Sequence, residues 1–229
     1  NEILNFLVKR ELLDPRKKGD LPKVRDRKNY REESNPAFLP DEFDRFKGEL
    51  YKFDQNCLDQ IDEWKKRWFI NWVRFQYQGG FRPHEARLIT IGDCEVDTRK
   101  DGRKIAIIRV RSDTKTGSRE VAMNGNTYLN LKYHLNKGIK LRNQQIELIN
   151  KMVVNGKKVY DDYKKKITEP IPEVYRANND DFLLMNPFLP KRHIYHMEHI
   201  RHWYKDILSR CDFGRKYTLY SLRSTHISF

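Results

Sequence analysis

Several segments of the chain place apolar residues at the three- and four-residue spacing of an amphipathic helix. The spacing predicts helices over residues 2–13, from Pro40 to about Phe53, and from about Leu58 to Tyr77. The widest apolar stripe belongs to the third helix and is formed by Ile61, Trp64, Trp68, Trp72 and Phe75. A stripe of this width is typical of a helix that faces a core, so we expect its tryptophans to be buried rather than to form a binding platform.

A different periodicity follows the third helix. Gly79 and Gly80 are suited to end it, and Pro83 fits the first turn of a short new helix. Residues 104–111 are rich in β-branched side chains, and residues 119–123 can pair back with them across a turn. The sequence therefore predicts a small antiparallel sheet or hairpin within a mainly helical fold.

The rest of the chain is less regular. The polar, lysine-rich stretch 137–179 shows no clear period, and we assign no element to it. A short apolar run, 182–185, ends at Asn186-Pro187. Further helices are predicted from Asn124 to about Leu135, from about Tyr195 to Leu208, and from about Leu219 to the end of the sequence.

The composition of the chain indicates the class of partner that it binds. The 229 residues include 46 Lys and Arg against 32 Asp and Glu, which gives a net charge of +14. Such an excess favours a polyanionic partner, because each cation near a phosphate releases a condensed counterion. Three separated cysteines, no signal peptide and no long apolar run predict a reduced, cytoplasmic protein.

The basic charge is concentrated near the start of the chain. Residues 15–31 contain eight Lys and Arg, two Asp, two prolines and no apolar period, as an extended linker would. This linker is either a solvated tether or a strap along a DNA backbone. In the second interpretation the DNA contacts are Arg16, Lys17, Lys18, Lys23, Arg25, Arg27 and Lys28.

Two arginines stand in settings suited to binding phosphate. A glycine turn brings Arg82 to a helix start, with Glu85 one turn further on to orient it. Near the end of the chain, Tyr220 and Arg223 share one face of a predicted helix. Each pattern considered alone also fits an ordinary charged helix surface.

The predicted hairpin carries two further cations. Lys115 lies in its turn, where a lysine beside a phosphate could protonate a leaving oxygen, and Arg119 follows as a candidate DNA contact. A lysine at a hairpin tip is more often simply solvated. Four histidines, which lie three residues apart, would be a rival metal site, but a helix turns such residues away from one another, and we expect no metal there: His193, His196, His199 and His202.

Taken together and in order, these motifs resemble the tyrosine recombinase (phage integrase) family. The resemblance rests on three motifs: Gly-Phe-Arg-Pro-His-Glu at 80–85, Thr-Lys-Thr-Gly at 114–117 and Tyr-Ser-Leu-Arg-Ser-Thr at 220–225. The resemblance implies a mainly helical DNA breaking-rejoining fold over residues 36–229. Residues 1–35 resemble the end of the family's core-binding domain and its linker.

The resemblance also implies roles for individual residues. Arg82 and Arg223 match the two catalytic arginines, Glu85 the supporting acid, and Lys115 the general acid of the hairpin. Tyr220 departs from the family's usual His or Lys at its position, and Ser224 stands where a second His is common. All twelve tyrosines precede Arg223, so we expect the chain to be a fragment that stops before the nucleophilic tyrosine.

The implied activity is site-specific DNA recombination through a covalent 3′-phosphotyrosyl intermediate, without a cofactor. The expected partner is double-stranded DNA, on which the full-length protein would form a tetramer, while the given chain would be mostly monomeric. No membrane partner is expected, and the resemblance implies a protein that acts in a bacterial nucleoid or in the host cell of a phage or mobile element. Two alternatives remain open: a type IB topoisomerase-like enzyme, and a DNA-binding relative that has no catalytic activity.

Overall fold

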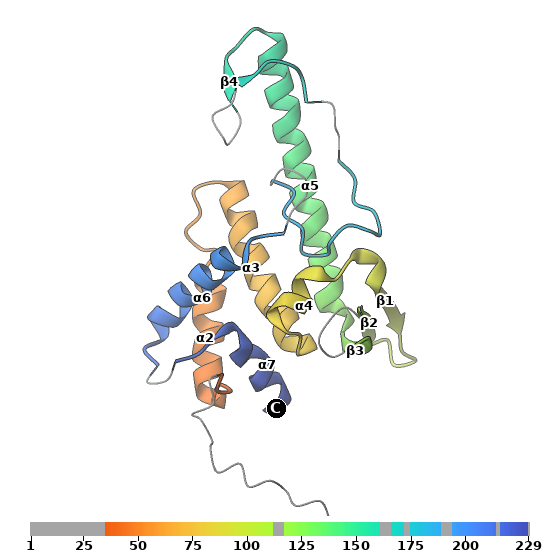
Figure 1. Cartoon of the computed structure of the whole chain (residues 1–229), viewed down its shortest axis with the longest axis vertical. Helices are drawn as coiled ribbons and strands as arrows, with labels where there is room; N and C mark the ends of the chain where they lie inside the picture. The colour runs from red at the N-terminus through yellow and green to blue at the C-terminus, as the bar shows by residue number, and fades with distance from the viewer. Residues whose placement is uncertain are drawn as a thin grey trace, which may run out of the picture. The chain divides into compact units, whose positions relative to one another are not determined.

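The computed structural model describes residues 35–111, 117–160, 166–171, 175–188, 194–213 and 216–228. The predicted fold class is confirmed, because the described part is mainly helical with a small antiparallel sheet. Its elements, drawn in Figure 1, are α2 (Pro40–Lys52), α3 (Gln60–Gly79), α4 (Pro83–Leu88), the 3-10 turn η2 (Ile91–Asp93), β1 (Cys94–Thr98), β2 (Lys104–Val110), β3 (Arg119–Asn124), α5 (Gly125–Val154), β4 (Val159–Tyr160), β5 (Lys166–Ile167), α6 (Met197–Cys211) and α7 (Leu219–Ser228). The helix predicted at 2–13 lies outside the described residues.

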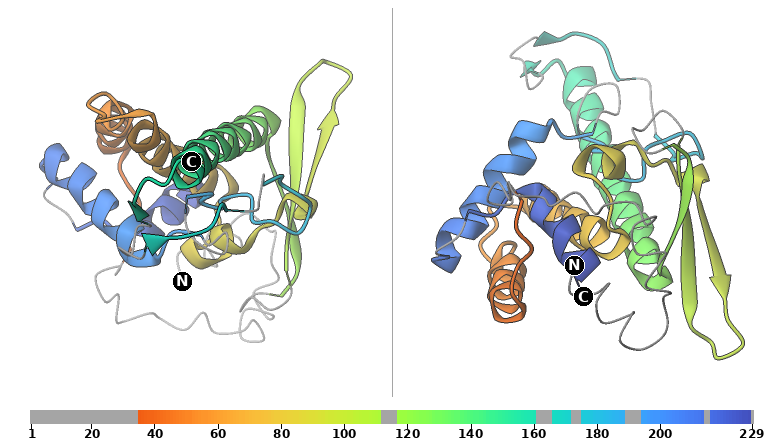
Figure 2. Two further views of the ribbon diagram at one scale, coloured as in Figure 1. Left: turned by 90° about the horizontal axis from the view of Figure 1, so that it is seen from above. Right: turned by 60° about the horizontal axis from the view of Figure 1, so that its bottom comes forward.

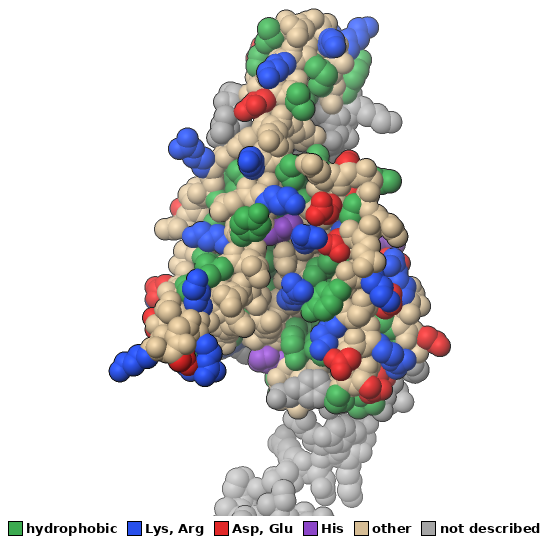
Figure 3. All heavy atoms as spheres, turned by 180° about the vertical axis from the view of Figure 1, so that it is seen from behind, with side chains coloured by type: hydrophobic (Ala, Val, Ile, Leu, Met, Phe, Trp, Pro, Cys, Tyr) green, Lys and Arg blue, Asp and Glu red, His purple; other side chains and the backbone are tan. Residues whose placement is uncertain are grey.

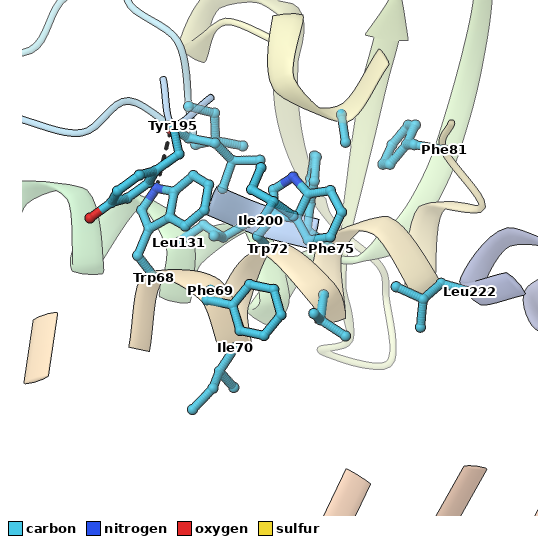
Figure 4. Packing of buried hydrophobic residues seen from close by; sticks show 14 of the residues in the cluster. Trp68, Phe69, Ile70, Trp72, Phe75, Phe81, Leu131, Tyr195, Ile200 and Leu222 are labelled. Carbon is cyan, nitrogen blue, oxygen red and sulfur yellow. Dashed lines mark hydrogen bonds between the residues drawn. The ribbon is translucent and has the colours of Figure 1, made fainter. Parts of the chain in front are cut away.

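Helix α3 is the centre of the core. Its tryptophans Trp64, Trp68 and Trp72 are at most 2% exposed, which confirms the prediction that they are buried. Two of them also donate hydrogen bonds across the core: Trp64 Nε1 to the carbonyl of His134 (2.8 Å) and Trp68 Nε1 to that of Leu184 (3.1 Å). Figure 4 shows the close packing of apolar side chains around this helix. The indole groups therefore join segments that are distant in the sequence.

The sheet has the strand order β1-β2-β3, with both pairs antiparallel. Both predicted strands of the hairpin are present, and Ile108 is paired with Val121. Alternate residues of β2, Ala106, Ile108 and Val110, are buried, so one face of the sheet packs on the core. Strand β1 was not predicted, because four of its five residues are exposed and its apolar signal is weak. In Figure 2 the sheet stands on one side of the molecule and α6 on the other.

Helix α5 is much longer than predicted. It runs for 30 residues and continues to Val154, well into the stretch to which we assigned no element. Gly138 is one reason why the prediction ended the helix too early. A glycine is needed there because a Cβ atom would lie 2.4 Å from the ring of Trp64. The glycine weakens the helical pattern in the sequence, but it allows α5 to pack closely on α3.

The distal half of α5 projects from the body and is accompanied by the returning chain (Figure 1). Two asparagine side chains of α5 each make paired hydrogen bonds to one backbone position of that segment. Asn143 bonds N–H and C=O of Tyr175 at 3.0 and 3.1 Å, and Asn150 bonds those of Ile171 at 2.7 and 2.9 Å. These bonds give the irregular segment backbone partners that no strand supplies.

The two C-terminal helices pack on the first two helices of the described part. Helix α6 contacts α2, and α7 contacts α3. The predicted bounds of both helices agree with the structure to within three residues. The apolar run 182–185 is mostly buried, and a bridge between Phe182 and Thr90 ties it to the segment before the sheet. None of the helices in the described part is long and apolar enough to cross a membrane.

Candidate functional site

The turn between α3 and α4 presents Arg82 at a helix start. Gly80 has the positive φ of 58° that ends α3, and the ring of the next residue, Phe81, is fully buried. A Cβ atom on Gly80 would lie 2.4 Å from the His226 ring of α7. The glycine is therefore required by its backbone conformation and by the close approach of α7.

Glu85 is the centre of the site. It is 3% exposed and accepts hydrogen bonds from the backbone N–H of Arg82 (2.9 Å), from Arg82 Nη1 (2.8 Å) and from Arg119 Nη2 (2.7 Å). Burial raises the pKa of this carboxyl group, but the bonds from Arg119 and Arg82 outweigh burial and lower the pKa to about 2. Glu85 is therefore ionised at neutral pH and fixes both guanidinium groups.

Arg223 joins this group from α7. Its Nη1 donates a hydrogen bond to the carbonyl of Gly80, the residue that ends α3. Burial, followed by the charges of Arg82 and Arg119, lowers the pKa of Arg223, while Glu85 raises it. These effects require the charged groups to lie close together, and an arginine remains protonated at neutral pH even so.

The three guanidinium groups outnumber the one carboxylate among them, so the group has a net positive charge. The side chains of Arg82 and Arg119 are 29% and 27% exposed, and that of Arg223 is partly buried. Solvent can therefore reach these cations. Partly exposed guanidinium groups fixed by a buried carboxylate are suited to a phosphate group.

Long-range contacts hold α7 beside α3. Gln76 Nε2 donates a hydrogen bond to the carbonyl of Leu219 (2.8 Å), and Leu222 is fully buried. One turn further along α7, Thr225 Oγ1 accepts a hydrogen bond from the backbone N–H of Phe38 (2.9 Å). These bonds join residues more than 140 positions apart, and they position Arg223 opposite the Gly80 turn.

Tyr220 lies on the first turn of α7 and is 44% exposed. Its hydroxyl is close enough to Arg223 to affect the pKa of that arginine. Ser224 is engaged elsewhere, since its hydroxyl donates to the backbone carbonyl of Asn35 (3.0 Å). Tyr220 is therefore available at the site, whereas Ser224 supports the position of α7.

Of the residues singled out in the sequence, Arg82, Glu85, Arg119, Tyr220 and Arg223 lie in one place. Arg119 was expected as a DNA contact only, and its bonds to Glu85 were not foreseen. No sequence spacing indicates that pairing, because 34 residues separate the two side chains. Further predicted site residues lie outside the described part of the chain: Lys115 and the linker cations Arg16, Lys17, Lys18, Lys23, Arg25, Arg27 and Lys28.

Two further groups of the site were not predicted from the sequence. The Gly80 carbonyl and the Gln76 amide are recognised only through their partners on α7. Among the described residues, no cluster of three or more His, Cys, Asp or Glu could hold a metal ion. Of the four spaced histidines, His196, His199 and His202 are exposed on α6 or at its start, and His193 is outside the described part.

The fold is thus a mainly helical domain with a three-stranded sheet that carries a cluster of arginines between α3, α4, β3 and α7. No family model and no curated protein matches the sequence. Among solved structures, the chain is similar to the XerH site-specific recombinase bound to its difH substrate in a pre-cleavage complex, with 13% identity over 86% of this chain and a TM-score of 0.47. It is also similar to the XerA recombinase, with 17% identity over 98% of this chain and a TM-score of 0.46. The chain spans 44% of the first protein's length and 64% of the second's.

Proposed function

We propose that this chain is the DNA-cleaving domain of a tyrosine recombinase and takes part in site-specific recombination of double-stranded DNA in the cytoplasm. The observation that carries the proposal is the joint placement of Arg82 and Arg223, which come from distant parts of the chain. Glu85 fixes the first arginine and the Gly80 carbonyl binds the second. This arrangement supports the family resemblance that the order of the motifs in the sequence indicates.

In the proposed reaction, Arg82 and Arg223 neutralise the charge that develops on a pentacoordinate phosphate. Such electrostatic stabilisation is usually the largest contribution to this type of catalysis. A tyrosine from a segment that follows Phe229 would bond to the phosphorus while the bond to the 5′ oxygen breaks. Lys115 would supply the proton that the leaving 5′ oxygen takes. The 3′-phosphotyrosyl link keeps the bond energy for resealing, so no nucleotide or metal cofactor is needed.

Substitution of the arginines tests the proposal. In a polypeptide extended past Phe229 to the end of its gene, Arg82→Ala and Arg223→Ala should each lower DNA cleavage by at least about a hundredfold, or about 3 kcal/mol of transition-state stabilisation. Arg176→Ala, an exposed arginine outside the site, is the matched control. Lys115→Ala should regain activity on a substrate with a bridging sulfur in place of the 5′ oxygen. Full cleavage by Arg223→Ala would refute the assignment.

The covalent intermediate separates the proposal from its alternatives. A suicide substrate should give a denaturation-resistant adduct with the extended polypeptide and none with the 229-residue chain. A topoisomerase-like enzyme would relax any supercoiled plasmid, whereas a recombinase would require its own site and would assemble as a tetramer on it. Absence of an adduct from the extended polypeptide would favour a non-catalytic DNA-binding protein.

Tyr220 is proposed to position the phosphate rather than to transfer a proton. A neutral phenol can donate one hydrogen bond to a phosphate oxygen but brings no positive charge. Tyr220→Phe should therefore slow cleavage by about tenfold, the value of one neutral hydrogen bond, and Tyr220→His should remain active. Cleavage at the wild-type rate by Tyr220→Phe would mean that the hydroxyl has no role.

Binding to DNA is proposed to rest on the basic linker as well as on the arginines. A short duplex should bind the chain weakly, with an affinity that falls steeply as salt is added, because counterions are released from the phosphates. Deletion of residues 1–31 should reduce both the affinity and the slope. Binding that does not change with salt would contradict a contact with the phosphate backbone.

A further inference from the structure

A cavity lies between the end of α2, the middle of α3 and the first half of α5. Its volume is about 480 Å³, and none of its lining residues belongs to the arginine cluster described above. Sites for small molecules typically have volumes of about 300–1,000 Å³. The cavity is therefore large enough for a ligand of moderate size and is separate from the site of the proposed reaction.

Cations dominate the lining of this cavity. Arg67, Arg74 and Lys137 line it with one carboxylate, Asp54. Arg67 Nε is 2.9 Å from Asp54, and Lys137 is 3.8 Å from Glu63. Figure 3 shows Lys and Arg side chains spread over the middle of the face opposite to that of Figure 1. The cations of the cavity thus exceed the carboxylates that pair with them.

Arg74 is the cation of this group that has no carboxylate partner among the described residues. Its guanidinium instead lies over the ring of Tyr51, 4.6 Å from the ring centre. The ring holds the guanidinium in place without neutralising its charge. Arg74 is therefore prepared to bind an anionic group that enters the cavity.

The pKa of a buried histidine in the cavity wall agrees with a positive electrostatic potential there. Burial, and then the charges of Lys137 and Arg67, lower the pKa of His134 to about 4, although a hydrogen bond to the Trp64 carbonyl opposes the shift. His134 is therefore neutral at pH 7 and adds no charge of its own. The anion-binding charge of the cavity comes from its arginines and its lysine.

The cavity also offers groups suited to a planar, polar ring. Asn71 is 8% exposed, and its side chain makes no hydrogen bond with any of the described residues. The amide of Asn71 lines the cavity, and an amide can donate and accept hydrogen bonds at the same time, as the edge of a base does. Tyr133, in the α5 wall, is 72% exposed and presents a ring on which a base can stack.

We propose that this cavity binds a nucleoside phosphate. Arg74 and Lys137 would bind its phosphate, the Asn71 amide would bind the edge of its base, and Tyr133 would stack on the base. The phosphate part follows from the unneutralised guanidinium. The base part follows from the Asn71 amide in the cavity lining and the exposed Tyr133 ring. The site shares no residue with the proposed DNA-cleaving site, and it would give the protein a means of sensing a soluble nucleotide.

Calorimetric titration of the whole chain tests the proposal, with AMP, GMP, adenosine and inorganic phosphate as separate probes. We expect AMP or GMP to bind at one site per chain with a Kd of about 1 mM or tighter. Adenosine and inorganic phosphate should each bind at least about tenfold more weakly. Arg74→Gln and Tyr133→Ala should each weaken nucleotide binding by about tenfold. Circular dichroism and the melting temperature check that both variants are folded, and Arg74→Lys is a milder second variant.

Two controls separate this site from the arginine cluster. Lys140→Gln changes an exposed lysine on α5, the helix of Tyr133 and Lys137, but outside the cavity. Arg223→Gln changes the arginine cluster. Both variants should bind nucleotide as the wild type does. The proposal would be overturned by no saturable binding at about 10 mM probe, by undiminished binding in Arg74→Gln, or by phosphate binding as tightly as AMP. Loss of binding in Arg223→Gln alone would assign the nucleotide to the arginine cluster and would equally overturn it.

Discussion

The buried carboxylate of Glu85 fixes two arginines, and Glu85→Gln measures what this contributes to the fold. The amide keeps the shape of the side chain and removes its charge. The pKa of Glu85 is about 2, compared with 4.5 for an ordinary glutamate, and this difference corresponds to about 3 kcal/mol at neutral pH. Because the arginines are partly exposed, solvent screens the interaction. We expect Glu85→Gln to lower the free energy of unfolding by about 2–3 kcal/mol at pH 7.

The pH dependence of this loss has a definite sign. A folded-state pKa below the unfolded value stabilises the protein fully above about pH 4.5, and the stabilisation is lost as the pH falls towards 2. The difference between wild type and Glu85→Gln should therefore stay constant from pH 7 to about 5. It should fall to less than half by about pH 3.

Urea unfolding followed by tryptophan fluorescence is a suitable assay, because Trp64, Trp68 and Trp72 are all buried on α3. Glu147→Gln is the matched control, since Glu147 is exposed on α5 and has no ion pair with a described residue. An unfolding midpoint for Glu85→Gln equal to that of the control at pH 7 would refute the reasoning. A difference between wild type and Glu85→Gln that did not change below pH 4 would refute its electrostatic part.

Three further changes have expected outcomes. Gly80→Ala should destabilise the protein by about 1–3 kcal/mol in thermal unfolding, because φ is 58° and the new Cβ would lie 2.4 Å from the His226 ring; an unchanged melting temperature would contradict this. Gln76→Leu removes the 2.8 Å hydrogen bond to the Leu219 carbonyl and should cost about 1–3 kcal/mol. Amide exchange in α7 should become faster, and unaltered exchange there would show that packing alone holds the helix. His134 has its pKa lowered from 6.5 to about 4, so the unfolded chain takes up its proton first and wild-type stability should fall by about 3 kcal/mol between these pH values. His134→Gln should remove that slope in urea unfolding, and a slope that persists would assign it to other groups.

The sequence by itself determined the helices with strong periodicity and the hairpin. The stripe of tryptophans on α3 and the β-branched run of β2 carry their signals within a few residues, because burial of one helical or strand face imposes a fixed spacing. The motifs around Arg82 and Arg223 were also visible, since glycine, proline and arginine at a helix start have local causes. Each motif could be recognised without knowing what lay beside it.

Only the tertiary structure decided the length of α5 and the composition of the site. The pattern fails near Gly138 because a glycine suits close contact with Trp64, and the partners of Asn143 and Asn150 lie on a segment without periodicity. Arg119 contacts Glu85, and Arg223 contacts the Gly80 carbonyl, through side chains brought together by folding. Hydrogen bonds and ion pairs of this kind depend on distance in space, and sequence spacing does not record that distance once a chain folds back on itself.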